Sequence, residues 1–374
     1  NPERALANNS VAYTEKPDAG IFMKEWLSLY ESKSGERGIF NRSSAQAKAA
    51  ENGRRDADWD FGTNPCSEII LRPNQFCNLT EIVVRSTDTM TTLIQKVQIA
   101  TLLGTIQSTF TNFGYLRKRW QNNTEEERLL GVSLTGIMDS PILNGRETGL
   151  EKRLESLQEI AVETNRYWAK KFGINQSTAI TCVKPSGTVS QLVDSASGIH
   201  ARHNPYYIRT VRGDNKDPLT EFMIASGIPS EPDYMKPEHT TVFSFPMKAP
   251  TGSVCRNDMT AIEQLELWKT YAQHWCEHKP SVTISVKEEE WVPVGAWCWE
   301  NFSHLSGVSF LPFSDHTYQQ APYQDIDKAT YENMAKKMPT SIDWQKLQDF
   351  EKEDNTKGSQ ELACTAGVCE LVDI

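Results

Sequence analysis

NPCSEIIL, residues 64–71, is the stretch around which the sequence is organised, and FCNL, residues 76–79, follows it closely. Together they bring two thiols, a carboxylate and a side-chain amide into one short segment. Between them, RPNQ at residues 72–75 has Pro and Asn at the second and third positions of a β-turn. The pattern therefore predicts a β-hairpin that carries reactive side chains.

In a hairpin closed by this turn, Leu71 would face Phe76. Side chains alternate along a strand, so Cys66, Glu68 and Cys77 would share one face. Cys66 would lie about 13 Å along the strand from the position opposite Cys77, at about 3.3 Å per residue. A disulfide needs Cα atoms within about 7 Å. We therefore expect two separate thiols in the resting fold.

Glu68 distinguishes Cys66 from an ordinary core cysteine. A cysteine in a strand is most often a small apolar filler. An ionised carboxylate close by is costly to bury unpaired, so its presence indicates a function. A thiol and a carboxylate that face one cavity can carry out radical or acid–base chemistry.

A second motif, KPSGTVS at residues 184–190, follows a β-branched stretch at 177–183 that we expect to be a strand. A strand, a glycine-bearing turn and a helix start direct backbone N–H groups toward an anion. The hydroxyl groups of Ser186 and Thr188 would add donors. Pro-Ser-Gly-Thr is also a common helix-capping turn, so the motif taken alone leaves both interpretations open.

The chain ends with a second pair of thiols, Cys364 and Cys369, after a polar segment at residues 350–361. About a dozen flexible residues have a root-mean-square span near 20 Å, enough to move a dithiol between a surface and a cavity. A loop containing Gly367 can close to disulfide geometry. A zinc knuckle would need more ligands, and incidental cysteines in a disordered tail are the other alternative. The pattern favours a redox shuttle.

Helical spacing of apolar residues predicts helices at residues 20–34, 89–116 and 150–172, the last ending at Gly173. Thr124 has a helix-start signature. Residues 35–60 are charged and contain several glycines, which indicates irregular structure.

HWCEH, residues 274–278, places two histidines one helical turn apart. Cys276 would point elsewhere on such a helix, and no second pair of ligands follows at a suitable spacing. We therefore expect no metal site among these residues.

Composition sets outer limits on the function. The chain has 374 residues and a formal net charge of −10, and its length suits two or three domains or one large α/β barrel. The acidic balance disfavours a nucleic-acid polymer as partner, and no apolar run is long enough to span a membrane. Eight cysteines without a secretory signal suit a reducing compartment, so we expect a cytoplasmic protein.

Residues 64–68 resemble the finger-loop motif of ribonucleotide reductases, and residues 184–190 resemble the phosphate loop of their cobalamin-dependent class. The spacing of Cys66 and Cys77 and the cysteine pair at the chain end are similar to the monomeric adenosylcobalamin-dependent ribonucleoside-triphosphate reductases. The resemblance covers essentially the whole chain.

The fold that this resemblance implies is α/β: the C-terminal half of the family's ten-stranded α/β barrel, with the finger loop at about residues 61–80 inside it. Residues 1–349 would form the barrel part, and residues 350–374 a flexible tail with redox-active cysteines. Half a barrel leaves sheet edges open. We therefore expect an N-terminal half of the reductase as a partner chain or as the rest of a longer polypeptide.

The activity implied is reduction of ribonucleotides, expected to be triphosphates, to 2′-deoxyribonucleotides for DNA synthesis. Adenosylcobalamin, bound mostly outside this chain, would supply the radical that takes the hydrogen atom from Cys66. The thiyl radical would then abstract the ribose 3′ hydrogen. Glu68 would be the base at the 3′ hydroxyl, and Asn64 would hydrogen-bond the ribose hydroxyls. Cys77 would supply reducing equivalents and form a disulfide with a cysteine of the missing half.

The remaining roles concern substrate binding and turnover. ANNSV at residues 7–11 resembles a segment on the substrate side. The tail cysteines would reduce the active-site disulfide by exchange and be recharged by thioredoxin or a similar dithiol reductant. The residues implied are Ser186, Gly187 and Thr188 for the phosphates, Asn9 and Ser10 beside the substrate, and Cys364 and Cys369 for the redox relay.

Two alternatives stay open. A large-subunit fragment of a class I reductase would use an external radical subunit; the short interval from Cys66 to Cys77 and the absence of a tyrosine pair near the carboxyl end disfavour it. A cysteine hydrolase would pair Cys66 with a histidine such as His200, but it leaves the tail cysteines unexplained. A viral protein of the same kind would work in the host cytoplasm.

Overall fold

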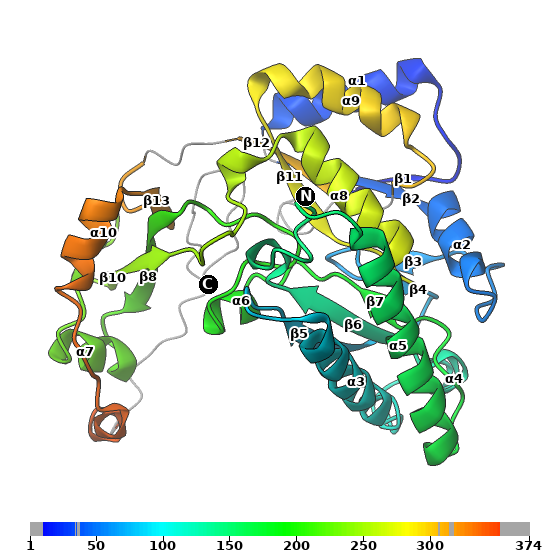
Figure 1. Ribbon diagram of the computed structural model, residues 1–374, viewed down its shortest axis with the longest axis horizontal. Helices are drawn as coiled ribbons and strands as arrows, with labels where there is room; N and C mark the ends of the chain where they lie inside the picture. Colours follow the sequence, from blue (N-terminus) through cyan, green and yellow to red (C-terminus); the bar gives the residue numbers. More distant parts are fainter. Residues whose placement is uncertain (1–9, 34, 36–37, 306, 314–317, 352–374) are drawn as a thin grey trace. The chain divides into compact units, whose positions relative to one another are not determined.

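The computed structural model describes residues 10–33, 35, 38–305, 307–313 and 318–351 (Figure 1). These residues form two compact units. The first lies within Asn1–Arg202 and Thr251–Phe313, and the second within His203–Pro250 and Ser314–Ile374.

Parallel strands form the centre of the first unit. Strands β5 (Asn78–Val83), β6 (Leu130–Thr135) and β7 (Thr181–Cys182) pair in that order. Strands β11 (Val282–Val286) and β12 (Val308–Pro312) form a second parallel pair. A parallel bridge between Val183 and Pro280 joins the two sets.

The chain direction reverses at the end of this array. Strand β2 (Gly38–Asn41) pairs antiparallel with β12, and β1 (Ser10–Tyr13) pairs parallel with β2. Two short strands, β3 (Gly62–Thr63) and β4 (Ile70–Leu71), form a separate antiparallel pair. The segment that carries Cys66 and Glu68 connects β3 to β4.

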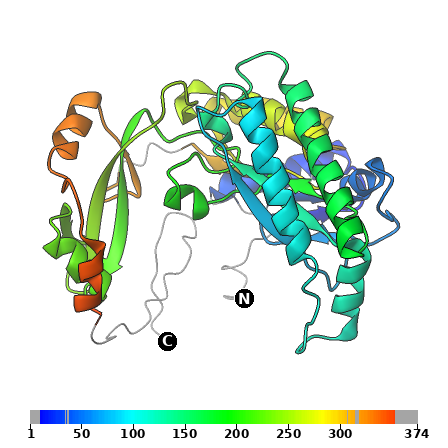
Figure 2. The same cartoon turned by 60° about the horizontal axis from the view of Figure 1, so that its bottom comes forward.

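Helices fill the connections because parallel neighbours need long crossovers. Helices α3 and α5 lie side by side against the β5-β6-β7 sheet, and α1 lies beside α9 (Figures 1 and 2). The helices of the first unit are α1 (Ala19–Ser32), α2 (Arg42–Glu51), α3 (Met90–Gln107), α4 (Lys118–Glu127), α5 (Leu150–Phe172), α6 (Val189–Leu192), α8 (Ala261–His274) and α9 (Trp291–Glu300).

Helix α5 has the bounds that its apolar spacing predicts. Its buried residues recur every three or four positions, which keeps them on the face toward the core. Gly173 ends the helix in the left-handed conformation, with φ 66°, and its N–H donates to the carbonyls of Ala169 and Lys170. The predictions for α1 and for the start of α3 are also confirmed.

The predicted hairpin across residues 72–75 is wrong. Leu71 pairs with Gly62 rather than Phe76, and the strand after the turn pairs with β6. Asn123 of α4 donates from its amide to the carbonyls of Pro73 and Asn74. The turn is therefore bound to a helix, which separates the strands that it was expected to join.

Other predicted helix and strand bounds also differ from the observed ones. Thr124 lies in the last turn of α4, not at a helix start. Helix α3 stops at Gln107, and the strand expected at 177–183 is limited to β7. Residues 35–60 contain β2 and α2, because packing against neighbouring strands offsets their weak local preference.

The second unit is an antiparallel sheet with strand order β13-β8-β10-β9. No described helix of either unit is long and apolar enough to cross a bilayer. The expected tail at 350–374 lies almost wholly outside the described residues. The elements of the second unit are β8 (Tyr206–Asp214), α7 (Pro218–Ala225), β9 (Ser230–Pro232), β10 (Thr240–Lys248), β13 (Tyr323–Asp325), α10 (Lys328–Ala335) and a 3-10 turn at Trp344–Asp349.

A buried ion cluster fixes both ends of the segment that carries Cys66. The Glu127 carboxylate accepts hydrogen bonds from Nε and Nη2 of Arg55, each at 2.9 Å. Nη2 of Arg72 lies 3.0 Å from the same carboxylate. All three side chains are almost completely buried. Arg55 precedes the segment and Arg72 follows it, so one carboxylate anchors the chain on both sides.

Replacing Glu127 should destabilise the fold strongly. In Glu127→Gln, two buried guanidinium groups lose their shared counter-charge, and removing one partner of a buried ion pair typically costs about 3–5 kcal/mol. Glu126 is the matched control, because it pairs with Arg72 while its own side chain is 62% exposed. Glu126→Gln should cost about 1 kcal/mol or less. Urea unfolding of both variants measures the difference, and equal losses would contradict this prediction.

Candidate active site

The turn between β3 and β4 carries Cys66 on a constrained backbone. The N–H of Ser67 donates to the carbonyl of Asn64 at 2.9 Å, and the N–H of Ile69 donates to Oδ1 of Asn64 at 3.0 Å. Ser67 has φ 63°. A Cβ atom on Gly307 would lie 2.4 Å from the Cβ of Ser67, so the chain can pass this turn only with glycine there.

A lysine from the second motif contacts both reactive side chains. Nζ of Lys184 lies 3.3 Å from Oε1 of Glu68 and 3.9 Å from the Cys66 sulfur. Glu68 is 0% exposed. Its other oxygen, Oε2, is buried and has no hydrogen-bond partner among the described residues. The first and second motifs therefore form one site, although the predicted roles did not include Lys184.

The environment keeps the Cys66 thiol protonated. Burial raises the pKa of Cys66, the Glu68 carboxylate raises it further, and Lys184 only partly opposes these effects. Burial likewise raises the pKa of Cys77, with Glu68 adding to the effect. A reactive nucleophilic cysteine needs a lowered pKa. These thiols are instead suited to give up hydrogen atoms.

Cys77 and Cys66 are both free, as expected, although the hairpin used to predict this is wrong. Cys77 directly precedes β5 and faces β6. A Cβ on Gly131 of β6 would lie 3.2 Å from the Cys77 sulfur and 2.5 Å from Leu79. Glycine at this position therefore makes room for the thiol against the sheet. Burial raises the pKa of a further thiol, Cys182, and the nearby Glu68 and Cys77 add to this effect.

The loop after β7 has the features of a ligand-binding turn. Ser186 has φ 54°, and its buried Oγ has no hydrogen-bond partner among the described residues. A Cβ on Gly187 would meet nothing within 4 Å, so the backbone faces open space there. Thr188 is exposed. The predicted helix start is weaker than expected, because α6 spans only Val189–Leu192.

His278 holds β4 against β6 and was missed as a positioning residue. Its Nδ1 accepts from the N–H of Ile70 at 3.3 Å, and its Nε2 lies 3.0 Å from the carbonyl of Leu130, so Nε2 carries the proton. Burial lowers the pKa of His278 well below its usual range, which keeps the ring neutral. The one-turn spacing to His274 is absent because α8 ends at His274, whose Nδ1 pairs with Glu155.

His200 does not serve as a base for Cys66. Its Nδ1 lies 2.9 Å from the Ser197 carbonyl, and its Nε2 accepts from the N–H of Thr283 at 3.0 Å. Both ring nitrogens are thus used by the backbone, and burial lowers the pKa of the ring. The arrangement disfavours a cysteine hydrolase.

Of the other predicted site residues, the structure describes only Ser10. Ser10 is exposed and pairs with Gly38 through β1. Asn9, Cys364 and Cys369 lie outside the described residues, so their roles stay predictions.

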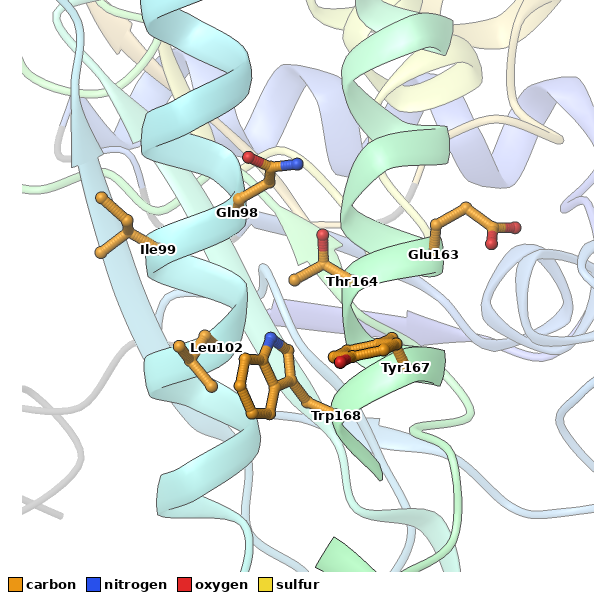
Figure 3. Close-up of a pocket in the computed structure, with 7 residues that line it drawn as sticks. All are labelled: Gln98, Ile99, Leu102, Glu163, Thr164, Tyr167 and Trp168. Atoms are coloured by element: carbon orange, nitrogen blue, oxygen red, sulfur yellow. The ribbon is translucent and has the colours of Figure 1, made fainter. Parts of the chain in front are cut away.

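A groove of about 460 Å³ is lined by residues of α3 and α5 and by none of the thiols described above (Figure 3). The groove is mostly apolar. Its lining residues are Gln98, Ile99, Leu102, Glu163, Thr164, Tyr167 and Trp168.

Alkylation by iodoacetamide should separate Cys66 from the buried thiols. Because the pKa of Cys66 lies above its ordinary value, its reaction rate should be low at pH 7 and still rise above pH 9. Cys182, Cys276 and Cys298 are buried and should react about 100-fold more slowly until urea unfolds the chain. Peptide mass mapping assigns each site, with Cys66→Ser as control. Early labelling of Cys182 would contradict the described burial.

No family model matches the sequence. Curated relatives match it along most of its length. The adenosylcobalamin-dependent ribonucleoside-triphosphate reductase of Lactobacillus delbrueckii is 27% identical, with the match covering 98% of this chain and 53% of that protein. The enzyme of the same name from Euglena gracilis is 28% identical over 83% of this chain and 42% of its own length. The chain thus spans about half the length of the curated relatives it matches.

Solved structures agree with the sequence matches on the fold. A crystal structure of a B12-dependent, class II ribonucleotide reductase has a TM-score of 0.77 at 24% identity, covering 92% of this chain and 52% of that one. A class Id ribonucleotide reductase α subunit from Actinobacillus ureae has a TM-score of 0.52 at 12% identity. The predicted α/β fold, as about half of a reductase barrel, is confirmed. The chain is thus similar in sequence to adenosylcobalamin-dependent ribonucleoside-triphosphate reductases and shares its fold with a class II ribonucleotide reductase.

Proposed function

We propose that this chain is the catalytic part of an adenosylcobalamin-dependent reductase that converts ribonucleoside triphosphates to 2′-deoxyribonucleotides for DNA synthesis. One observation supports this most directly. A protonated thiol, Cys66, shares a site with a buried carboxylate whose Oε2 has no partner among the described residues. The relatives that are named for this activity are about twice as long as this chain.

In this proposal Cys66 gives its hydrogen atom to a radical and then abstracts the 3′ hydrogen of the ribose. The raised pKa supports this role, since a hydrogen atom can be taken only from the protonated thiol. Glu68 accepts the 3′ hydroxyl proton at Oε2, the oxygen that no described residue occupies. Asn64 uses its Oδ1 to hold the turn, so its Nδ2 is the group left for the ribose hydroxyls.

The reducing equivalents come from Cys77 and the chain end. Cys77 and a cysteine of the other half together supply two hydrogens. One leaves with the 2′ hydroxyl as water, the other forms the new C–H bond at C2′, and the two sulfurs join in a disulfide. Cys364 and Cys369 reduce that disulfide by thiol exchange, and thioredoxin or a similar dithiol reductant reduces them in turn. A cytoplasmic location belongs to this proposal, because the thiols must return to the reduced state after each turnover.

The phosphate groups of the substrate bind at the loop after β7. Ser186 has a buried hydroxyl without a partner among the described residues, and Gly187 leaves its backbone open to a ligand. Thr188 adds a second hydroxyl. Asn9 and Ser10 are proposed to lie on the substrate side of the site.

Adenosylcobalamin would supply, when bound, the organic radical that takes the hydrogen atom from Cys66. The residues present fit this use, because Cys66 is half-buried and can be approached, whereas Cys182 is fully buried. The groove on α3 and α5 is not part of this site. We therefore propose that the cofactor is held mostly by the other half.

An N-terminal half of the reductase is the proposed partner. Among the described residues β5 pairs only with β6, which leaves one edge of the sheet open next to α3. Helix α3 also exposes apolar side chains: Ile99, which lines the groove of Figure 3, is 61% exposed, and Leu103 is 52% exposed. A strand on this edge and a helix on this face would bury both surfaces.

Deoxynucleotide formation tests the proposed activity. The chain is assayed with a ribonucleoside triphosphate, adenosylcobalamin and dithiothreitol, alone and with a candidate N-terminal half. We expect turnover in the mixture and none detectable for Cys66→Ala, while Glu68→Gln should lower kcat about 10²–10⁴-fold. Cys298→Ala is the matched control, since this thiol lies in the core. Turnover by Cys66→Ala, or turnover that needs an external radical subunit instead of cobalamin, would reject the proposal.

Charged substitutions on α3 test the partner surface. Ile99→Asp and Leu103→Asp should each weaken association with the N-terminal half by about tenfold or more, because a charge would be buried in an apolar contact. Val292→Asp on α9 is the control, with 82% of that side chain exposed. Analytical ultracentrifugation measures association, and unchanged thermal unfolding shows that each variant is folded. Equal weakening by Val292→Asp would point to a different surface.

A further inference from the structure

We propose that Lys184 is a positioning residue for this site. Its ammonium group binds Oε1 of Glu68, which leaves Oε2 as the oxygen that accepts a proton. The same ammonium group holds the Cys66 sulfur beside Glu68. This inference rests on the proposed function and adds a residue to it. It is based on the two contacts of Nζ, 3.3 Å to Glu68 Oε1 and 3.9 Å to the Cys66 sulfur.

The backbone of Lys184 is fixed, so these contacts do not depend on a mobile loop. Its N–H donates to Oγ of Ser133 on β6 at 2.8 Å. Its carbonyl oxygen would lie 2.4 Å from a Cβ on Gly198, which has φ 54°, so the loop packs tightly there. The preceding residue, Val183, is bridged to Pro280. The lysine therefore projects from a site held by two strands.

The two oxygens of Glu68 have different surroundings. The residue is fully buried, and a buried ionised carboxylate needs an opposite charge nearby. Lys184 provides that charge at Oε1, while Oε2 faces no described donor. The lysine thus places a counter-charge on one oxygen without blocking the oxygen that would meet a hydroxyl group.

Lys184 keeps its own proton through the proposed step. Burial alone would lower the pKa of Lys184, but Glu68 and Cys66 outweigh burial and raise it. When Glu68 takes the 3′ hydroxyl proton, an O–H bond of the sugar breaks and an O–H bond forms at Oε2, with no change in electron count. Among the described residues, the thiols of Cys66, Cys77 and Cys182 also lie close enough for this carboxylate to raise their pKa.

The position of Lys184 in the sequence would suggest another role. It comes just before Ser186–Thr188, so a phosphate ligand would be the simple interpretation. Nζ instead contacts Glu68 and Cys66. The two roles predict different kinetics. Loss of a phosphate ligand raises KM with little change in kcat, whereas loss of a positioning residue lowers kcat with little change in KM.

The first test needs no cofactor and no turnover. It compares the rate at which iodoacetamide alkylates Cys66 in Glu68→Gln and in Glu68→Gln/Lys184→Met. Both variants are measured at the same pH, which lies below the pKa of Cys66. With the carboxylate already neutral, removing the ammonium group should slow alkylation about tenfold, which corresponds to about one pKa unit. Lys96→Met in the same background is the matched control, because Lys96 is 34% exposed against 33% for Lys184 and also pairs with one carboxylate. A change of less than twofold in the alkylation rate would contradict an interaction between Lys184 and Cys66.

The second test uses the assembled enzyme with its cofactor. Lys184→Met should lower kcat at least tenfold and change KM for the triphosphate less than threefold. Lys184→Arg should restore most of the rate. A raised KM with unchanged kcat would overturn the proposal in favour of a phosphate ligand. If the alkylation result holds but the wild-type assembly forms no deoxynucleotide, the proposed function fails while the contact stands.

Discussion

The buried carboxylate of Glu127 is the interaction on which the geometry of the site depends. It receives guanidinium groups from Arg55 and Arg72, one on each side of the segment that carries the reactive turn. Arg55 also donates to the carbonyl of Ile70 at 2.9 Å. A short segment between two such anchors has little freedom. It can therefore hold a left-handed Ser67 and a half-buried thiol.

A second buried glutamate, Glu68, has fewer hydrogen-bond partners than Glu127. Both oxygens of Glu127 are occupied by donors, which makes it a structural charge. Glu68 has Lys184 on one oxygen and no described donor on the other. A buried polar atom without a partner costs about 1–3 kcal/mol, so the surroundings must enforce its position. The contrast separates an anchoring carboxylate from one that is available for chemistry.

The thiols fit hydrogen-atom chemistry better than nucleophilic chemistry. Burial and Glu68 raise the pKa of Cys66, Cys77 and Cys182 rather than lowering it. The histidine that a hydrolase would use, His200, gives both ring nitrogens to backbone groups. These observations agree with the similarity of the chain to adenosylcobalamin-dependent reductases, and they were not available from residue spacing.

The sequence by itself determined features that depend on neighbouring residues. Apolar spacing and Gly173 predict α5 with its observed bounds, because helix periodicity is a property of the local backbone. The grouping of Asn64, Cys66 and Glu68 was also readable, since they are close along the chain, but they were expected on a strand and lie in the turn between β3 and β4. Only the tertiary structure decided the pairing of β5 with β6 and the contact of Lys184 with Glu68, which lie 116 residues apart. Such contacts depend on how strands and helices pack. In the turn at 72–75, for example, the carbonyls of Pro73 and Asn74 accept hydrogen bonds from Asn123 of α4, and no hairpin forms there.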